Sequence, residues 1–167
     1  MQERYDVAIV GTGPAGLSAA VTLKIRNRNI LLLGDEELSP KIRKAHEINN
    51  YLGLPKISGE ELCKKYQNHI NSMDIRVKQE EIKTIYSMGK YFSLVGKSAK
   101  TYEATALILA TGVNFDKKIK GEEEFLGRGV SYCATCDAML YKGKKVVIIG
   151  ATPKEEMEAE YMSEVAS

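Results

Sequence analysis

Apolar runs and a helical pattern alternate over the first 35 residues of the chain. Residues 5–10, YDVAIV, form a short β-branched apolar run, which is typical of a parallel strand buried on both faces. After a glycine-rich turn, residues 17–26 carry apolar side chains at helical spacing. Residues 30–33, ILLL, then predict a second buried strand. The order of strand, turn, helix and strand predicts a βαβ unit.

The middle of the chain changes from the helical period to the strand period. Residues 38–54 have no clean periodicity, and SGEE at 58–61 predicts the cap and first turn of a helix that runs to about residue 72. Strand-like runs then follow near 75–77 with 81–86, at 91–95 and from 102 onward. Because Gly-containing turns separate these runs, we expect an antiparallel meander. The run ALILA at 106–110 returns to the pattern of a buried strand.

The composition changes at residues 114–124, a charged segment that predicts a domain boundary. We therefore expect one domain over residues 1–115 and the beginning of a second over 116–167. In the second, KKVVIIG at 144–150 predicts a first strand and 154–166 predicts a helix. One strand and one helix do not bury a sheet by themselves, so the pattern indicates a fragment or a chain that another segment completes.

Composition and charge narrow the class of protein. The chain has 167 residues, of which 44% are hydrophobic, enough to fill a core. A formal net charge of +2 does not favour a nucleic acid or a membrane surface as partner. No uninterrupted apolar run approaches the roughly 20 residues that a spanning helix needs. The N-terminus lacks the basic-then-apolar order of a signal peptide, so we expect a soluble cytoplasmic protein.

The turn after the first strand reads GTGPAG at 11–16, a complete G-x-G-x-x-G motif. Gly11 allows the tight turn, Gly13 lets the backbone approach a pyrophosphate, and Gly16 lets the helix pack close to the strand. The helix N-terminus offers N–H groups to phosphates. Asp35 or Glu36, about twenty residues beyond the motif, would accept hydrogen bonds from a ribose. In its βαβ context the motif predicts a dinucleotide site, and a turn that binds nothing is the alternative.

The second candidate for chemistry is the pair Cys133 and Cys136, two residues apart. Three cysteines are too few and odd in number for a secreted disulfide framework, and in a reducing compartment such a pair is more often catalytic or metal-binding than structural. A helix that begins here would favour the reactive thiolate, and Asp137 could take or return a proton. Structural zinc usually takes four ligands, but the remaining cysteine and two histidines have no paired spacing. Redox chemistry is therefore favoured, and Cys63 is expected to be a buried helix residue.

Together these residues resemble the low-molecular-weight thioredoxin reductases over essentially the whole chain. The resemblance rests on GTGPAG at 11–16, NYLG at 50–53, ATG at 110–112, GRGVS at 127–131 and CATCD at 133–137. In that family a central NADPH domain carries the cysteine pair and splits an FAD domain in sequence. The resemblance implies an α/β fold: a three-layer, Rossmann-like FAD-binding domain with a parallel sheet and an antiparallel β-meander. The start of a second Rossmann-like domain would follow.

The resemblance also implies roles for particular residues. Cys136 would face the flavin, Cys133 would exchange with the substrate disulfide, and Asp137 would be the acid–base group. FAD contacts are implied at Gly11, Thr12, Gly13, Pro14, Ala15, Gly16, Gly34, Asp35, Glu36, Lys41, Ile42, Asn50, Ile82, Ala110, Thr111 and Gly112. Of these, Asn50 would lie near the flavin ring and Ile82 near the adenine. Lys41 and Ile42 belong to SPKI at 39–42, where the family usually has Gly-Gly-Gln-Leu.

The implied activity is that of a flavin-dependent thioredoxin-disulfide reductase. The implied partners are thioredoxin or a similar dithiol protein, an electron donor and a second copy in a homodimer, without metal, nucleic acid or membrane. The second FAD segment, expected near the end of a full-length chain, is absent. A non-catalytic FAD-binding module and a zinc-bound structural protein are the alternatives.

The second glycine motif, GATPKE at 150–155, departs most from the family pattern. Thr152 puts a side chain where backbone should meet phosphate, and Glu155 and Glu156 put negative charge at a helix end that should receive an anion. Such losses resemble the clostridial-type branch, which takes electrons from ferredoxin, so ferredoxin is the expected donor. The alternatives are an NADPH enzyme with a degenerate loop and a truncated copy without activity.

Overall fold

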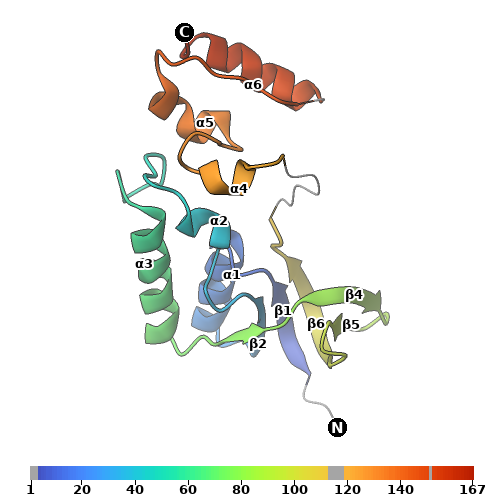
Figure 1. Ribbon diagram of the computed structural model, residues 1–167. Helices are drawn as coiled ribbons and strands as arrows, with labels where there is room; N and C mark the ends of the chain where they lie inside the picture. Colours follow the sequence, from blue (N-terminus) through green and yellow to red (C-terminus); the bar gives the residue numbers. More distant parts are fainter. Residues whose placement is uncertain (1–3, 113–118, 151) are drawn as a thin grey trace. The chain divides into compact units, whose positions relative to one another are not determined.

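The computed structural model describes residues 4–112, 119–150 and 152–167 (Figure 1). The chain divides into two compact units, one of Met1–Arg43 with Glu60–Asp116 and the other of Lys44–Gly59 with Lys117–Ser167. The first unit contains β1 (Tyr5–Val10), α1 (Pro14–Ile25), β2 (Ile30–Gly34), α2 (Pro40–Arg43), α3 (Gly59–Ser72), β3 (Val77–Gln79), β4 (Ile82–Ser87), β5 (Phe92–Gly96) and β6 (Thr101–Leu109). The second contains α4 (Glu122–Phe125), α5 (Ala134–Asp137), the 3₁₀ helix η1 (Ala138–Tyr141) and α6 (Pro153–Ser163).

The first unit is built on one sheet in the order β3-β2-β1-β6-β5-β4. β3, β2, β1 and β6 run parallel, with Val7 of β1 opposite both Ile30 of β2 and Ala106 of β6. β6, β5 and β4 pair antiparallel. The expected α/β fold with a parallel sheet and an antiparallel meander is therefore confirmed.

Side chains alternate along the central strands between two cores, as the strand period requires. Val7 and Ile9 pack with α1 and with Ile70 of α3, which cover one face of the sheet (Figure 1). Ala8, between them in sequence, belongs to a second cluster with Leu94 of β5 and other meander residues. The helices thus cover one face of the sheet, and meander residues contribute to the core on the other face.

The prediction of two separate strands after residue 101 is wrong. The third meander strand and the run 106–110 are one continuous strand, β6, because no turn residue interrupts Thr101–Leu109. Its first half pairs antiparallel with β5 and its second half pairs parallel with β1. The end of β6 is also less buried than predicted, since Leu109 is exposed. Within residues 38–54, which showed no periodicity, α2 forms a single helical turn.

The predicted strand at 144–150 is also wrong. In the part of the chain that the structure describes, residues 145–150 belong to no strand and make no backbone hydrogen bond. A β-strand forms only where neighbouring strands take up its backbone groups, and the second unit has no described strand to do so. The predicted boundary between residues 115 and 116 lies in 113–118, outside the described residues.

The second unit is formed by short helices and turns. Residues 48 and 57 form an isolated bridge that closes the loop around Asn50. α5 packs against α6, which begins at Pro153 near its predicted start and ends at Ser163, with Met162 buried. No helix within residues 4–112, 119–150 and 152–167 is both long and apolar enough to cross a membrane.

Candidate functional site

The first candidate site is the glycine turn between β1 and α1. Gly11 has φ +118°, and a Cβ built there would lie 2.1 Å from the carbonyl oxygen of Ala110. A Cβ at Gly16 would lie 1.9 Å from the carbonyl oxygen of Gly11. Only glycine fits either position, because α1 and the end of β6 approach the turn so closely. Gly11 therefore shapes the turn, and Gly16 sets the helix close to the strand.

Gly13 differs from these two glycines because it has room around it. It is the N-cap residue of α1, no side chain caps this helix end, and Pro14 occupies the first helical turn. A Cβ at Gly13 would have as its nearest neighbour the Ser39 hydroxyl, at an ordinary distance of 3.4 Å. The turn thus presents the open N-terminus of a helix of 12 residues, including Ala15, to a ligand.

Thr12 connects the glycine turn to the end of β2. Its side chain is buried, and its hydroxyl donates to the carbonyl oxygen of Asp35 at 2.9 Å and accepts from the Asp35 N–H at 3.1 Å. A Cβ at Gly34 would lie 2.7 Å from Cγ2 of Thr12, so a side chain there would separate the two segments. This contact places the acidic segment beside the turn, at the carboxyl edge of the sheet.

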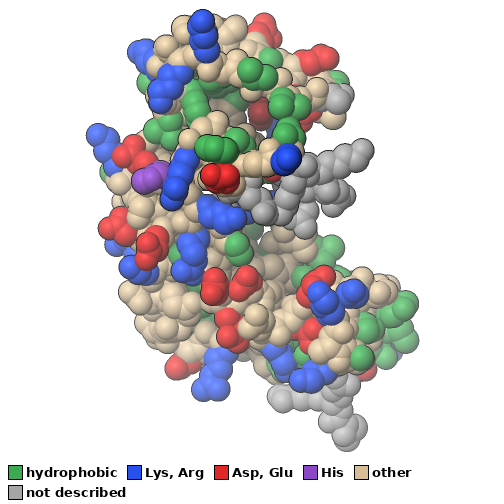
Figure 2. Space-filling view, viewed as in Figure 1, with side chains coloured by type: hydrophobic (Ala, Val, Ile, Leu, Met, Phe, Trp, Pro, Cys, Tyr) green, Lys and Arg blue, Asp and Glu red, His purple; other side chains and the backbone are tan. Residues whose placement is uncertain are grey.

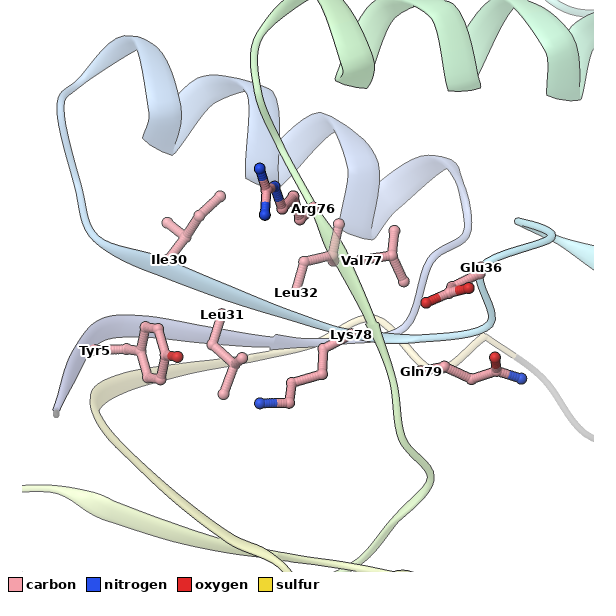
Figure 3. Close-up of a pocket in the computed structure, with 9 residues that line it drawn as sticks. All are labelled: Tyr5, Ile30, Leu31, Leu32, Glu36, Arg76, Val77, Lys78 and Gln79. Atoms are coloured by element: carbon pink, nitrogen blue, oxygen red, sulfur yellow. The ribbon is translucent and has the colours of Figure 1, made fainter. Parts of the chain in front are cut away.

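The two candidate acids after β2 have different surroundings. The Oδ1 of Asp35 accepts from the N–H of Glu37 at 2.9 Å, which closes a local turn. Glu36 is exposed and lines a cavity of about 410 Å³ (Figure 3). The cavity is also lined by Arg76, Lys78 and Gln79 near β3. The Glu36 carboxylate is therefore the better placed of the two to accept hydrogen bonds from a ligand hydroxyl.

The remaining cofactor candidates lie in four places. The N–H of Ala110 donates to the carbonyl oxygen of Val10 at 2.8 Å, which keeps the exposed pair Thr111 and Gly112 next to the end of β1. On α2, Lys41 is exposed and Ile42 half-buried. Ile82 packs against the meander core, and Asn50 belongs to the second unit, where it is exposed. The glycine turn, Gly34–Glu36 and Ala110–Gly112 are the candidates that meet at one edge of the sheet.

The second candidate site is the cysteine pair, which forms a disulfide with its Cα atoms 5.3 Å apart. Cys133 is the N-cap residue of α5, and its sulfur accepts from the N–H of Cys136 at 3.2 Å. Cys133 is half-buried and Cys136 is exposed. An N–H directed at the Cys133 sulfur favours a negative charge there once the disulfide is reduced.

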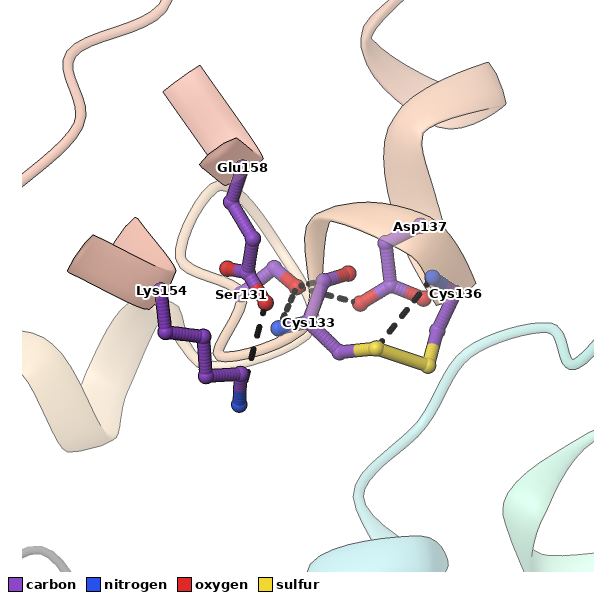
Figure 4. The surroundings of a disulfide bond; sticks show 6 residues. All are labelled: Ser131, Cys133, Cys136, Asp137, Lys154 and Glu158. Atoms are coloured by element: carbon purple, nitrogen blue, oxygen red, sulfur yellow. Dashed lines mark hydrogen bonds and ion pairs between the residues drawn. A yellow bond between two sulfur atoms is a disulfide. The ribbon is translucent and has the colours of Figure 1, made fainter. Parts of the chain in front are cut away.

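Ser131 and Asp137 join the segment before the disulfide to the helix after it (Figure 4). The Ser131 hydroxyl donates to Oδ2 of Asp137 at 2.6 Å and accepts from the N–H of Cys133 at 3.1 Å. The negative charge of Asp137 reaches Tyr141, whose pKa is raised mainly by burial and further by this carboxylate. Ser131 had no predicted role, since its contact with Asp137 depends on how the loop folds.

The third cysteine is a buried helix residue, as predicted. Cys63 is 3% exposed in α3. Within the described residues, no three His, Cys, Asp or Glu side chains are grouped to hold a metal ion.

The N-terminus of α6, where the second glycine motif lies, is closed by its own side chains. Thr152 is the N-cap residue, and Glu155 accepts hydrogen bonds from both the N–H of Thr152, at 2.8 Å, and its hydroxyl, at 2.5 Å. A Cβ at Gly150 would lie 2.2 Å from Cβ of Glu155. A carboxylate thus occupies the end of the helix that would otherwise receive an anion.

Known proteins are similar to this chain over most of its length. Residues 5–153 match the family model of the pyridine nucleotide-disulphide oxidoreductases. The thioredoxin reductase of Bacillus subtilis (strain 168) is 35% identical over 164 residues, which cover 98% of this chain and 52% of that protein. The chain spans about half the length of the curated relatives that it matches.

Two solved structures are similar throughout the chain. A ferredoxin-flavin thioredoxin reductase from Clostridium acetobutylicum is 53% identical with a TM-score of 0.67, covering 99% of this chain and 57% of that one. The thioredoxin reductase from Streptococcus pyogenes is 28% identical with a TM-score of 0.88. The match covers 99% of this chain and 54% of that one. This likeness confirms the Rossmann-like architecture expected from the sequence.

Proposed function

This chain belongs to the pyridine nucleotide-disulphide oxidoreductase family, and from that premise we propose that it is the FAD-binding and disulfide-bearing part of a thioredoxin reductase. The carrying observation is the Cys133–Cys136 disulfide with Asp137 at the end of the same short helix. The proposed partner is thioredoxin or a similar dithiol protein. By resemblance, the proposed protein is a cytoplasmic homodimer, divided near residue 115 into an FAD domain and a second domain.

The first unit has the features that FAD needs. The open N-terminus of α1 would receive the pyrophosphate, with Gly13 leaving room for it, and Glu36 would hold the adenosine ribose. By resemblance, Asn50 would lie near the flavin ring and Ile82 near the adenine. Bound FAD, once reduced by the electron donor, would supply the electron pair that reduces the disulfide.

Once reduced, the cysteine pair would carry the electrons to the partner by disulfide exchange. The Cys133 thiolate, which can accept from the Cys136 N–H, attacks one sulfur of the partner disulfide and expels the other. Cys136 then attacks Cys133 and releases the partner as a dithiol. Two protons accompany the two electrons, and Asp137 is the proposed group that exchanges a proton with the pair.

The experiment that tests this function is covalent trapping. The partner is a thioredoxin with one active-site cysteine, activated by thionitrobenzoate. Reduced Cys136→Ser should form a stable mixed disulfide through Cys133, because the resolving thiol is gone. Cys133→Ser should form none, and Cys63→Ala should behave as the parent, which forms and then resolves the adduct.

Adducts are counted on a non-reducing gel and by mass. A mixed disulfide with Cys133→Ser and none with Cys136→Ser would reverse the two roles. No adduct with either variant would contradict the proposed function.

We propose ferredoxin rather than NADPH as the electron donor. The support is the N-terminus of α6, where Glu155 takes the position of an anion and Pro153 has no N–H to donate. Losing one hydrogen bond to a charged phosphate costs about 1.5–3 kcal/mol, and about 1.4 kcal/mol corresponds to tenfold in affinity. An NADPH enzyme with a degenerate loop is the alternative.

Flavin bleaching distinguishes the two donors. The FAD-loaded protein is mixed without oxygen with NADPH and, separately, with reduced ferredoxin. Ferredoxin should bleach the flavin absorbance, and micromolar NADPH should not. Rapid, saturable bleaching by NADPH would contradict this choice of donor.

A further inference from the structure

The Ser131 hydroxyl lies between two parts of the cysteine site. It follows the turn at residues 127–130, where the N–H of Gly127 donates to the carbonyl oxygen of Val130 at 2.9 Å. Its oxygen accepts from the N–H of Cys133 at 3.1 Å, two residues further on. A weaker contact of 3.3 Å joins it to the carbonyl oxygen of Cys133. These contacts fix the oxygen relative to the backbone that begins the redox helix.

A hydroxyl has only one proton to donate. The contact of 2.6 Å with Oδ2 of Asp137 is much shorter than that with the Cys133 carbonyl, and a carboxylate is the stronger acceptor. Ser131 therefore donates to Asp137. Both side chains are half-buried, which limits the competition from water.

The bond leaves the other carboxylate oxygen available. Oδ1 of Asp137 makes no hydrogen bond to another residue in the described parts of the chain. Figure 4 shows the Asp137 carboxylate between the Ser131 hydroxyl and Cys136, on the side of the loop where the disulfide lies. The side chain is thus held by one oxygen, and its second oxygen lies on the side of Cys136 (Figure 4).

We propose that Ser131 is a positioning residue, whose hydroxyl holds the Asp137 carboxylate beside the cysteine pair so that its second oxygen can exchange a proton there. This rests on the proposed acid–base role of Asp137. Ser131 itself transfers no proton and touches no substrate.

A small dithiol tests the proposal without flavin or thioredoxin. A thiolate of dithiothreitol attacks one sulfur of the Cys133–Cys136 bond, and the other cysteine leaves as a thiolate and takes a proton. The second dithiothreitol sulfur then releases the first cysteine, which is also protonated. The protein gains two electrons and two protons, and dithiothreitol becomes a cyclic disulfide.

The experiment measures the rate of this reduction in the full chain by acid quench and mass spectrometry of alkylated thiols. Because a general acid–base group can raise a reaction rate by a large factor, we expect Asp137→Asn to slow the reduction about tenfold or more. Ser131→Ala should slow it about fivefold, and Ser131→Thr, which keeps the hydroxyl, should stay within about twofold of the parent. Ser163→Ala, on the exposed face of α6, is the matched control and should have no effect.

The double variant separates positioning from a purely structural role. If Ser131 acts through Asp137, adding Ser131→Ala to Asp137→Asn should cost nothing further, within about twofold. If Ser131→Ala slows the reduction by the same factor in the parent and in Asp137→Asn, Ser131 only supports the Cys133 backbone. This result would overturn the proposal. Failure of Ser131→Thr to rescue, or no effect of Ser131→Ala, would also overturn it.

The same variants distinguish this proposal from the function on which it rests. If Asp137→Asn does not slow reduction, both the acid–base role of Asp137 and the positioning role of Ser131 are wrong. If the dithiothreitol results are as expected but thioredoxin is not trapped, the proposed partner is wrong and the role of Ser131 is supported.

Discussion

At the residue scale, Cys63 and the Cys133–Cys136 pair have contrasting surroundings. The Cys63 sulfur is buried in α3 and contacts the carbonyl oxygen of Leu38 at 3.7 Å. Burial raises the pKa of the Cys63 thiol, and the nearby positive charge of Arg43 opposes this to a smaller extent. A thiol of raised pKa in an inaccessible position is a poor nucleophile. Thiol chemistry is therefore confined to the Cys133–Cys136 pair.

Gly13 offers a clean test of cofactor binding, because a Cβ there meets no backbone. Its φ of −78° and ψ of 178° suit a β-branched residue, so Gly13→Val should fold. The valine side chain would occupy the space of the pyrophosphate, and the loss of phosphate hydrogen bonds should weaken FAD binding about a hundredfold or more.

The measurement is the flavin absorbance retained after purification and the affinity for added FAD. Ser18→Val, at an exposed position of α1, is the control and should stay yellow. Gly13→Val protein with its full flavin content would show that the cofactor does not approach this turn.

At the scale of elements, the sequence predicts what is encoded locally. The strands β1 and β2 and the helix α1 are predicted by their own periods, α3 is predicted by the cap at residues 58–61, and the glycine turn between β1 and α1 is predicted by its motif. The continuity of β6 is not, because half of its pairing is with β5 and half with β1, which is distant in sequence. The Ser131–Asp137 contact is not predicted either, because it depends on how the loop folds and no periodicity or motif indicates it.

Glu80 stabilises the meander, because its hydrogen bonds connect the segment before β4 to the turn between β5 and β6. Its carboxylate accepts from the N–H of Ser98 at 3.1 Å and from the Ser98 hydroxyl, and contacts the Tyr102 hydroxyl at 3.3 Å. The hydrogen bonds from Ser98 lower the pKa of Glu80. A carboxyl group whose pKa is lowered by folding stabilises the fold above its unfolded pKa, and this contribution is lost as the pH falls through the folded value.

Glu80→Gln should therefore unfold at a lower urea concentration than the parent at pH 7, and the difference should shrink below the ordinary range of a glutamate. Urea midpoints at pH 7 and near pH 3 measure this. Glu37→Gln, at an exposed position after β2, is the control. A difference that does not change with pH would mean that the charge of Glu80 contributes nothing.

At the scale of the whole molecule, the two units differ in how completely they bury their apolar side chains. The first has a core on each side of its sheet. The second exposes large apolar side chains, including Val147 at 86%, Ile149 at 71% and Met157 at 71%. Figure 2 shows apolar side chains on the surface of this unit. Few buried contacts and unbonded backbone are the marks of local opening at little free-energy cost.

Amide hydrogen exchange should reveal this difference. The N–H groups of β1 and β6, which are bonded on the sheet, should exchange slowly. Those of residues 145–150 should exchange at nearly the rate of an unfolded chain, because they donate to no described residue. Mass spectrometry of peptic fragments across a range of protein concentrations measures both. Protection of 145–150 that grows with concentration would instead mean that the segment pairs with another copy.

The two hydrogen bonds between Thr12 and Asp35 also bear on how a holoprotein is assembled. They join the turn after β1 to the end of β2 before any ligand arrives, so little chain remains to be ordered when a cofactor binds. Loading should then follow simple second-order kinetics, with a rate that rises in proportion to the FAD concentration and reaches no plateau set by a slow rearrangement. A finished apoprotein would be able to acquire its cofactor long after synthesis.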